Sequence, residues 1–318
     1  MSTRRLVDPE LLAGLDAVPP FSFTRETLPM LRQAMEETFV SAQSGADFSG
    51  VEIETRTIRG GDGQDMAIVI CAPSGAQKHA RPAICHIHGG GYVFGSARMA
   101  QLMNLSLVRE LGAVIVSVEY RLAPETPHPG PLEDCYAALV WMTDHAAELG
   151  IDTRRIAVKG ESAGAGLAAA LTLLVRDRGG PYLCHQNLLY PMLDDRTGSI
   201  GDPHPYTGEF VWTAEANRLA WACLLGKAPG GDDVSPFAAA ARADDLSALP
   251  PAFIVTGALD LFVEEDMDYA RRLIRAGVPT ELHVYPGAYH GFIVNTGASV
   301  VAAAARDVKA ALRKAFQA

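Results

Sequence analysis

Apolar and polar positions alternate along the chain in a pattern that predicts strands separated by helices. From Val51 onward, short runs of β-branched and apolar residues recur, and segments of helical length lie between them. This order is typical of an α/β protein whose mostly parallel sheet is covered on both faces. The predicted strands are 51–58, 65–71, 82–87, 113–118, 155–159, 186–190, 252–256 and 281–285, and the predicted helices are 98–111, 132–149, 162–178, 264–276 and 298–316.

The first two strands are predicted to form an antiparallel hairpin. The sequence Gly-Gly-Asp-Gly at 60–63 lies between them, and such a short glycine-rich connection suits a tight turn but not a crossover. We therefore expect one antiparallel edge on an otherwise parallel sheet.

Two regions depart from this rhythm. Residues 1–48 have helical spacing without strands, and residues 194–237 interrupt two core strands with turn formers and aromatic side chains. Long insertions in compact domains are usually functional, often as lids. The apolar stripe of the first region needs a partner, which makes a joint cap a better hypothesis than a frayed tail. The stripe is Leu28, Leu31, Met35 and Phe39. The predicted division is a cap of 1–48 and 194–237 and a catalytic α/β core of 49–193 and 238–318.

Composition narrows the class of protein. The 318 residues are 48% hydrophobic and 20% charged, as in soluble globular proteins, and the net charge of −10 argues against nucleic acid or an anionic membrane as partner. The apolar stretch 163–175 is shorter than the roughly 20 residues that span a bilayer. An acidic N-terminus argues against a signal peptide, and five scattered cysteines argue against a disulfide framework or a zinc site. We expect a cytoplasmic protein, and its sequence leaves a homodimer open.

The pentapeptide Gly-Glu-Ser-Ala-Gly at 160–164 is the sharpest chemical signal. A predicted strand precedes it and a predicted helix follows, as in a nucleophile elbow, where a tight turn exposes a serine hydroxyl. The alternative is that Ser162 only caps the following helix.

The sequence His-Gly-Gly-Gly at 88–91 directly follows another apolar strand. Successive glycines allow backbone N–H groups to approach a ligand and to stabilise a developing oxyanion. The alternatives are a flexible loop or a metal site at His86 and His88, but no third ligand follows at suitable spacing.

Together these motifs resemble those of the hormone-sensitive-lipase-like (bacterial family IV) carboxylesterases of the α/β-hydrolase superfamily. The matching segments are His88–Tyr92, Glu119–Glu125, Gly160–Gly164 and Tyr289–Phe292, in the order that the family has. The resemblance implies an eight-stranded sheet, a helical cap and no cofactor. It also implies an oxyanion hole formed by the N–H groups of Gly90, Gly91 and Ala163.

The family order of serine, acid and histidine identifies the remaining candidates. Asp260 follows a predicted strand at the carboxyl edge of the sheet, although the proline that typically follows the family's acid is leucine here. Asp194 is the alternative acid. Asp266 and Asp268 fall in a predicted helix, where we expect them to be solvated.

His290 is the predicted base because it lies in a loop after the last strand and before a glycine. His283 lies within that strand and is interpreted as structural. His128 lies between two prolines, which indicates a structural or cap-facing role.

These residues predict a serine carboxylesterase that hydrolyses short-chain acyl esters through a Ser162, His290 and Asp260 triad and an acyl-enzyme. An apolar acyl site under an aromatic cap favours small ester substrates. The alternatives are an amidase or carbamate hydrolase, an acyltransferase, and a non-catalytic small-molecule receptor. The predicted substrate contacts are Tyr92, Phe210, Trp212 and Phe262.

Overall fold

An eight-stranded sheet forms the centre of the computed structural model, which describes residues 2–17, 23–43, 45–75, 79–199, 201 and 203–317. The strands are β1 (Val51–Arg59), β2 (Asp65–Pro73), β3 (Arg81–Ile87), β4 (Val114–Val118), β5 (Ile151–Glu161), β6 (His185–Leu189), β7 (Ala252–Gly257) and β8 (Thr280–Tyr285). Their order is β1-β2-β4-β3-β5-β6-β7-β8. The β1–β2 and β2–β4 pairs are antiparallel and the others are parallel, which confirms the predicted fold class and hairpin.

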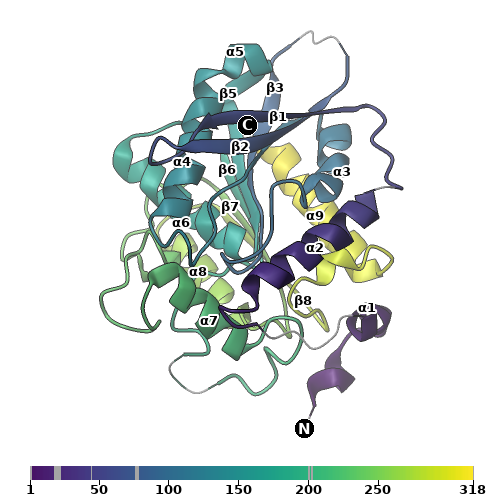
Figure 1. Cartoon of the computed structure of the whole chain (residues 1–318), viewed down its shortest axis with the longest axis vertical. Coiled ribbons are helices and arrows are strands. Elements are labelled where there is room, and N and C mark those ends of the chain that lie inside the picture. Colours follow the sequence, from purple (N-terminus) through teal and green to yellow (C-terminus); the bar gives the residue numbers. More distant parts are fainter. Residues whose placement is uncertain are drawn as a thin grey trace.

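Helices cover both faces of the sheet (Figure 1). They are α1 (Leu12–Ala17), α2 (Leu28–Gln43), α3 (Gln101–Leu111), α4 (Gly130–Asp144), α5 (Ala146–Leu149), α6 (Ala163–Arg178), α7 (Ala214–Leu225), α8 (Val263–Arg275) and α9 (Ser299–Ala315). Short 3₁₀ helices lie at Thr3–Leu6, Pro9–Leu11, Ala240–Arg242 and Phe292–Val294. Side chains of α4, α6 and α8 join one apolar cluster, and those of α3 and α9 join the other.

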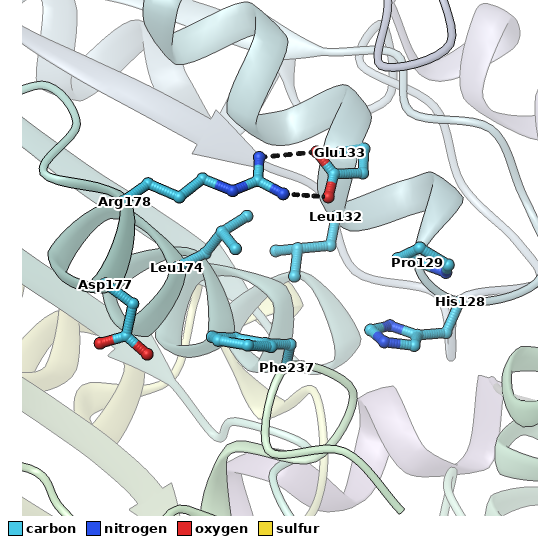
Figure 2. Close-up of a pocket in the computed structure, with 8 residues that line it drawn as sticks. All are labelled: His128, Pro129, Leu132, Glu133, Leu174, Asp177, Arg178 and Phe237. Atoms are coloured by element: carbon cyan, nitrogen blue, oxygen red, sulfur yellow. Dashed lines mark hydrogen bonds and ion pairs between the residues drawn. The ribbon is translucent and has the colours of Figure 1, made fainter.

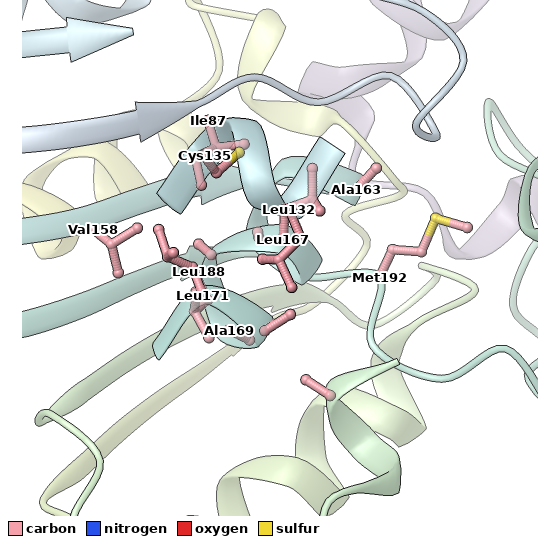
Figure 3. Packing of buried hydrophobic residues seen from close by; sticks show 14 of the residues in the cluster. Ile87, Leu132, Cys135, Val158, Ala163, Leu167, Ala169, Leu171, Leu188 and Met192 are labelled. Atoms are coloured by element: carbon pink, nitrogen blue, oxygen red, sulfur yellow. The ribbon is translucent and has the colours of Figure 1, made fainter. Parts of the chain in front are cut away.

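Helix α6 is the most buried helix of the first cluster. Figure 3 shows its Leu167 and Leu171 among Val158 of β5 and Leu188 of β6. Full burial of one such side chain contributes about 1.5–3 kcal/mol to the free energy of folding. The start of α6, which follows Ser162, is therefore fixed rigidly against the sheet.

Two of the differences from the predicted boundaries have clear local reasons. Strand β5 begins at Ile151, before the predicted 155, because Ile151 pairs with Arg81 although the residues between are polar. The predicted helix 132–149 is two helices, α4 and α5, that meet at His145.

Residues 2–17 pack beside the loop that follows β8. The N–H of Asp8 donates to the Gly287 carbonyl at 3.1 Å, the Tyr289 hydroxyl donates to the Leu11 carbonyl at 3.3 Å, and Val7 and Leu11 are buried. Figure 1 shows α1 in the neighbourhood of β8. This part of the chain is ordered by contacts with the last part.

Helices α2 and α7 are the longest helices of the two irregular regions. Leu28 of the α2 stripe is buried, and Leu31 and Met35 pack against the first cluster. The ring of Phe23, just before α2, stacks on Trp212, just before α7, at 6.2 Å between centroids. The two regions therefore touch each other. Residues 1, 18–22, 44, 200 and 202 of the predicted cap lie outside the described residues.

In the described part of the chain, no helix combines the length and the apolar character that crossing a membrane requires.

Candidate active site

Ser162 lies at the turn between β5 and α6 with φ 54° and ψ −122°, a conformation that is costly for a residue with a side chain. A Cβ on Gly164 would lie 2.2 Å from the Ile87 carbonyl oxygen and 2.3 Å from that of His88, so only glycine fits there. The Ser162 side chain makes no helix-capping hydrogen bond. The turn thus has the geometry of a nucleophile elbow, and the simple capping alternative is wrong.

The structure brings the three predicted triad residues together. Ser162 Oγ lies 2.9 Å from His290 Nε2, and His290 Nδ1 lies 2.8 Å from Asp260 Oδ2. Asp260 is supplied by the β7–α8 loop and His290 by the loop after β8. The exposed fractions of Ser162, His290 and Asp260 are 7%, 6% and 0%. This chain of contacts can move a proton from the hydroxyl to the imidazole while a buried carboxylate faces the ring.

Aromatic rings surround the imidazole of His290. Tyr190 and Phe262 meet it edge-on at 5.0 and 5.1 Å between centroids, and Trp212 lies at 6.2 Å. Such packing restricts rotation of the ring. Tyr190 was not predicted to belong to the site, although its position directly after β6 indicates a residue at the carboxyl edge of the sheet.

The predicted substrate contacts divide into two groups. Phe262 and Trp212 lie beside His290, and the ring of Phe210 lies 6.3 Å from that of Tyr289. Tyr92 is not brought together with them, because it is fully buried and its hydroxyl donates to the Met192 carbonyl at 3.0 Å. Tyr92 therefore supports the loop of residues 88–95 from within.

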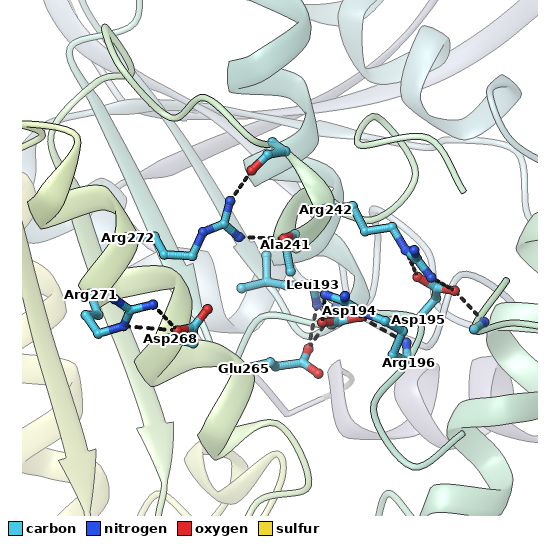
Figure 4. A network of polar contacts seen from close by, with 12 residues as sticks. Leu193, Asp194, Asp195, Arg196, Ala241, Arg242, Glu265, Asp268, Arg271 and Arg272 are labelled. Atoms are coloured by element: carbon cyan, nitrogen blue, oxygen red, sulfur yellow. Dashed lines mark hydrogen bonds and ion pairs between the residues drawn. The ribbon is translucent and has the colours of Figure 1, made fainter. Parts of the chain in front are cut away.

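The alternative acid has another partner. The carboxylate of Asp194 accepts two hydrogen bonds from the Arg196 guanidinium, at 2.8 and 2.7 Å (Figure 4). The neighbouring Glu265 accepts the Leu193 N–H at 2.7 Å, and burial raises its pKa well above the usual range. These contacts fix the loop after β6 without reaching His290.

The prediction that Asp266 is solvated is wrong. Asp266 is fully buried, because it shares the inner face of α8 with Tyr269, Ala270 and Leu273. Burial, then the charges of Glu265 and Asp260, raise the pKa of the Asp266 carboxyl well above its ordinary value. The surroundings of Asp266 therefore favour the neutral form of its carboxyl group.

The other predictions about this helix and the remaining histidines agree with the structure. Asp268 is exposed and pairs with Arg271 at 2.7 Å, as Figure 4 shows. His283 is partly exposed on β8 and contacts Glu281. The backbone N–H of His128 donates to the Leu224 carbonyl at the end of α7, so this residue faces the irregular region.

The glycine loop lies directly against the elbow. The Gly90 carbonyl accepts the N–H groups of Val93 and Phe94 at 3.0 and 2.8 Å. Among the described residues, the N–H groups of Gly90, Gly91 and Ala163 have no acceptor in the protein. These are the three donors that the family resemblance implies for an oxyanion.

Two aromatic contacts hold this loop. A Cβ on Gly91 would lie 2.3 Å from the Trp212 ring, so the indole covers this glycine directly. On the other side, the Tyr120 hydroxyl donates to the His88 carbonyl at 2.9 Å, and the two rings stack at 4.2 Å. The tyrosine of the Glu119–Glu125 motif thus positions the loop.

A buried ionic cluster lies at the end of β5. Glu161 contacts Lys159, and its Oε2 lies 2.9 Å from His86 Nε2. Although burial opposes ionisation, Lys159 and His86 hold the pKa of Glu161 well below its usual range. Burial lowers the pKa of His88 to about 4. The two histidines predicted as an alternative metal site have other partners, and the described residues contain no group of three or more metal-ligating side chains.

Figure 2 shows a surface cavity of about 420 Å³ away from the triad. Leu132 of α4, Leu174 of α6 and Phe237 line it, and Arg178 bridges to Glu133 at its rim. No triad residue lines this cavity.

The chain is similar to known proteins in both sequence and structure. A family profile described as alpha/beta hydrolase fold matches residues 84–294. Carboxylesterase NlhH of Mycobacterium tuberculosis is 35% identical over 323 residues, which cover 98% of this chain and 97% of that protein. Ethyl acetate hydrolase of Pseudomonas putida is 29% identical over 90% of this chain and 92% of its own. The solved structure of a bacterial heroin esterase has a TM-score of 0.94 and 38% identity, with both chains fully covered.

Proposed function

The chain is a carboxylic ester hydrolase and belongs to the hormone-sensitive-lipase-like family of the α/β-hydrolase fold, and from this premise we propose that Ser162 is its nucleophile. The observation that carries the proposal is the 2.9 Å contact between Ser162 Oγ and His290 Nε2, continued to Asp260 at 2.8 Å. A serine hydroxyl needs such a base to attack an ester carbonyl near neutral pH.

In the proposed acylation step, Ser162 Oγ bonds to the carbonyl carbon while His290 Nε2 takes the hydroxyl proton. Asp260 stays ionised, accepts a hydrogen bond from the Nδ1–H of the ring and stabilises the imidazolium. The tetrahedral intermediate then expels the alkoxide, which takes the proton from Nε2 and leaves as the alcohol. The acyl group remains on Ser162.

Deacylation repeats these steps with water. His290 takes one water proton as the oxygen attacks the acyl carbon, and it returns this proton to Ser162 Oγ as the carboxylic acid leaves. In both steps the negative oxygen is proposed to accept hydrogen bonds from the N–H groups of Gly90, Gly91 and Ala163. Loss of one such donor typically lowers kcat about 10²- to 10³-fold.

We propose that the acyl group is short because the space in front of the triad is closed by aromatic rings. Trp212 covers Gly91, and Phe262 packs against His290. Residues 1–48 and 194–237 would then act together as the cap, which must move to admit substrate to a serine with 7% exposure. The relative named for ethyl acetate supports a small ester.

Other predictions about this chain remain proposals. Hydrolysis of amides or carbamates and acyl transfer to an alcohol would use the same acyl-enzyme, and the complete triad argues against a receptor role. A cytoplasmic location, the absence of nucleic acid partners and a homodimer stay predictions.

Replacing Ser162 by Ala tests the proposal. We expect kcat for a chromogenic acetyl ester to fall about 10⁴- to 10⁶-fold in a folded protein, because the triad acts as a unit. A serine-directed phosphonate should label Ser162 in the unmodified enzyme. A purified variant with a tenth of the original turnover would show that the nucleophile lies elsewhere.

A further inference from the structure

A side chain of α2 holds the backbone of the glycine loop. The Arg32 guanidinium donates through Nε to the Val93 carbonyl and through Nη2 to the Ala123 carbonyl, both at 2.7 Å. It also binds both carboxylate oxygens of Glu125, each at 2.9 Å. The planar guanidinium thus joins the cap helix to two loops of the core.

The loop contact continues toward the proposed oxyanion hole through two peptide units. The Val93 carbonyl, held by Arg32, shares its peptide unit with the Phe94 N–H, which donates to the Gly90 carbonyl at 2.8 Å. The Gly90 carbonyl in turn shares its peptide unit with the Gly91 N–H. Hydrogen bonds in series polarise one another, so a cation at one end strengthens the donor at the other end.

The second carbonyl contact fixes the position of the same loop. The Ala123 N–H donates to the Tyr92 carbonyl at 3.0 Å, and Arg32 bridges the Val93 and Ala123 carbonyls. The arginine side chain is 24% exposed, whereas its Glu125 partner is 60% exposed. The carbonyl contacts are therefore the more sheltered part of the cluster, and a shift of α2 would shift the loop.

We propose that Arg32 is a positioning residue for ester hydrolysis, which aims and polarises the Gly91 N–H toward the oxyanion only when the cap helix is seated. The inference rests on the proposed function, because it needs Gly91 as an oxyanion donor. It makes formation of the oxyanion hole depend on the cap.

The test compares Arg32→Met and Arg32→Lys with Gln33→Met, an exposed neighbour on α2 whose amide contacts Glu37. We expect kcat of Arg32→Met to fall about 10- to 100-fold, part of the loss seen when an oxyanion donor is removed. KM should stay within about threefold, since the donor acts on the transition state. Arg32→Lys keeps the positive charge but lacks the planar guanidinium, so its kcat should lie between those of Arg32→Met and the original enzyme. Gln33→Met should have the kcat and KM of the original enzyme.

A trifluoromethyl ketone distinguishes positioning from simple loss of structure. Ser162 adds to its carbonyl carbon, His290 takes the proton, and the resulting hemiketal oxygen is negative. Its inhibition constant should rise in the Arg32 variants by the same factor as kcat/KM falls. The downfield proton resonance of the His290–Asp260 contact should remain, which shows an intact triad.

An unchanged kcat in folded Arg32→Met and Arg32→Lys would overturn the inference, and so would a change confined to KM. If Arg32→Met does not fold, the inference is tested with Arg32→Lys alone, by its steady-state kinetics and by the inhibition constant of the trifluoromethyl ketone. Failure of the proposed function would appear separately, as activity that survives Ser162→Ala.

Discussion

Asp260 accepts the backbone N–H of Phe262 through Oδ1 at 3.0 Å, which leaves Oδ2 to face His290 at 2.8 Å. The loop after β7 therefore sets the rotation of the carboxylate. The contact also determines which atom an amide would present if it replaced the carboxylate.

In Asp260→Asn, the amide oxygen should keep the Phe262 N–H, and the NH₂ group should face His290 Nδ1. An NH₂ group there requires Nδ1 to be unprotonated, so the ring proton moves to Nε2. Nε2 must itself be unprotonated to accept the proton of the Ser162 hydroxyl. We expect kcat to fall about 10⁴-fold with the fold retained, measured by steady-state hydrolysis and circular dichroism. Asp194→Asn is the control, since Asp194 pairs with Arg196. A larger loss in that control, with both variants folded, would identify Asp194 as the acid.

Trp212→Ala should widen the acyl site. The indole lies over Gly91, and its removal opens space in front of Ser162. We expect kcat/KM for longer acyl chains to rise relative to acetyl esters, checked with a chromogenic ester series. Tyr206→Ala, an exposed aromatic residue of the same insertion, should leave the preference unchanged. Equal acyl preference in Trp212→Ala and the original enzyme would contradict the assignment of Trp212 to the acyl site.

Deleting residues 1–40 should abolish most activity. The deletion removes Leu11 and Leu28, which are buried against the core, and Arg32, which holds the glycine loop. It should also expose apolar surface, so we expect increased dye binding and aggregation in light scattering. A monomeric truncated protein with unchanged turnover would show that this region is not part of the cap.

Asp266→Asn should stabilise the protein increasingly as pH rises. Below about pH 4, Asp266 is protonated in both folded and unfolded chains and contributes nothing to pH dependence. Above this, the unfolded chain loses the proton while the folded protein, whose pKa for this group is raised, keeps it. The free energy of unfolding of the original protein thus falls by up to about 1.4 kcal/mol per pH unit, until the pH reaches the pKa of Asp266 in the folded protein.

Urea denaturation at about pH 5 and pH 8 measures this difference. The stability advantage of the asparagine variant should be larger at the higher pH. A constant difference between the two pH values would mean that Asp266 ionises alike in both states.

Most elements were predictable because the strands are apolar runs separated by helix-length segments. The triad candidates were predictable because each follows a strand, and parallel strands bring their carboxyl ends to one edge. The burial of Asp266 was not predictable, because a carboxyl on the inner face of a helix contradicts the ordinary preference for water. Arg32 was missed because its acceptors are backbone carbonyls 61 and 91 positions away. Every residue has a backbone carbonyl, so residue types do not show which carbonyls will accept a hydrogen bond.

The pairing of residues 2–17 with the loop after β8 has a consequence during synthesis on the ribosome. Leu11 and Tyr289 are 278 positions apart, so at ordinary rates of translation the first waits roughly 15 to 60 s for the second. His290 is the next residue to be made. Nascent chains that lack the loop after β8 therefore have neither the proposed base nor a docking place for residues 2–17, so we expect no ester hydrolysis before this loop has been made.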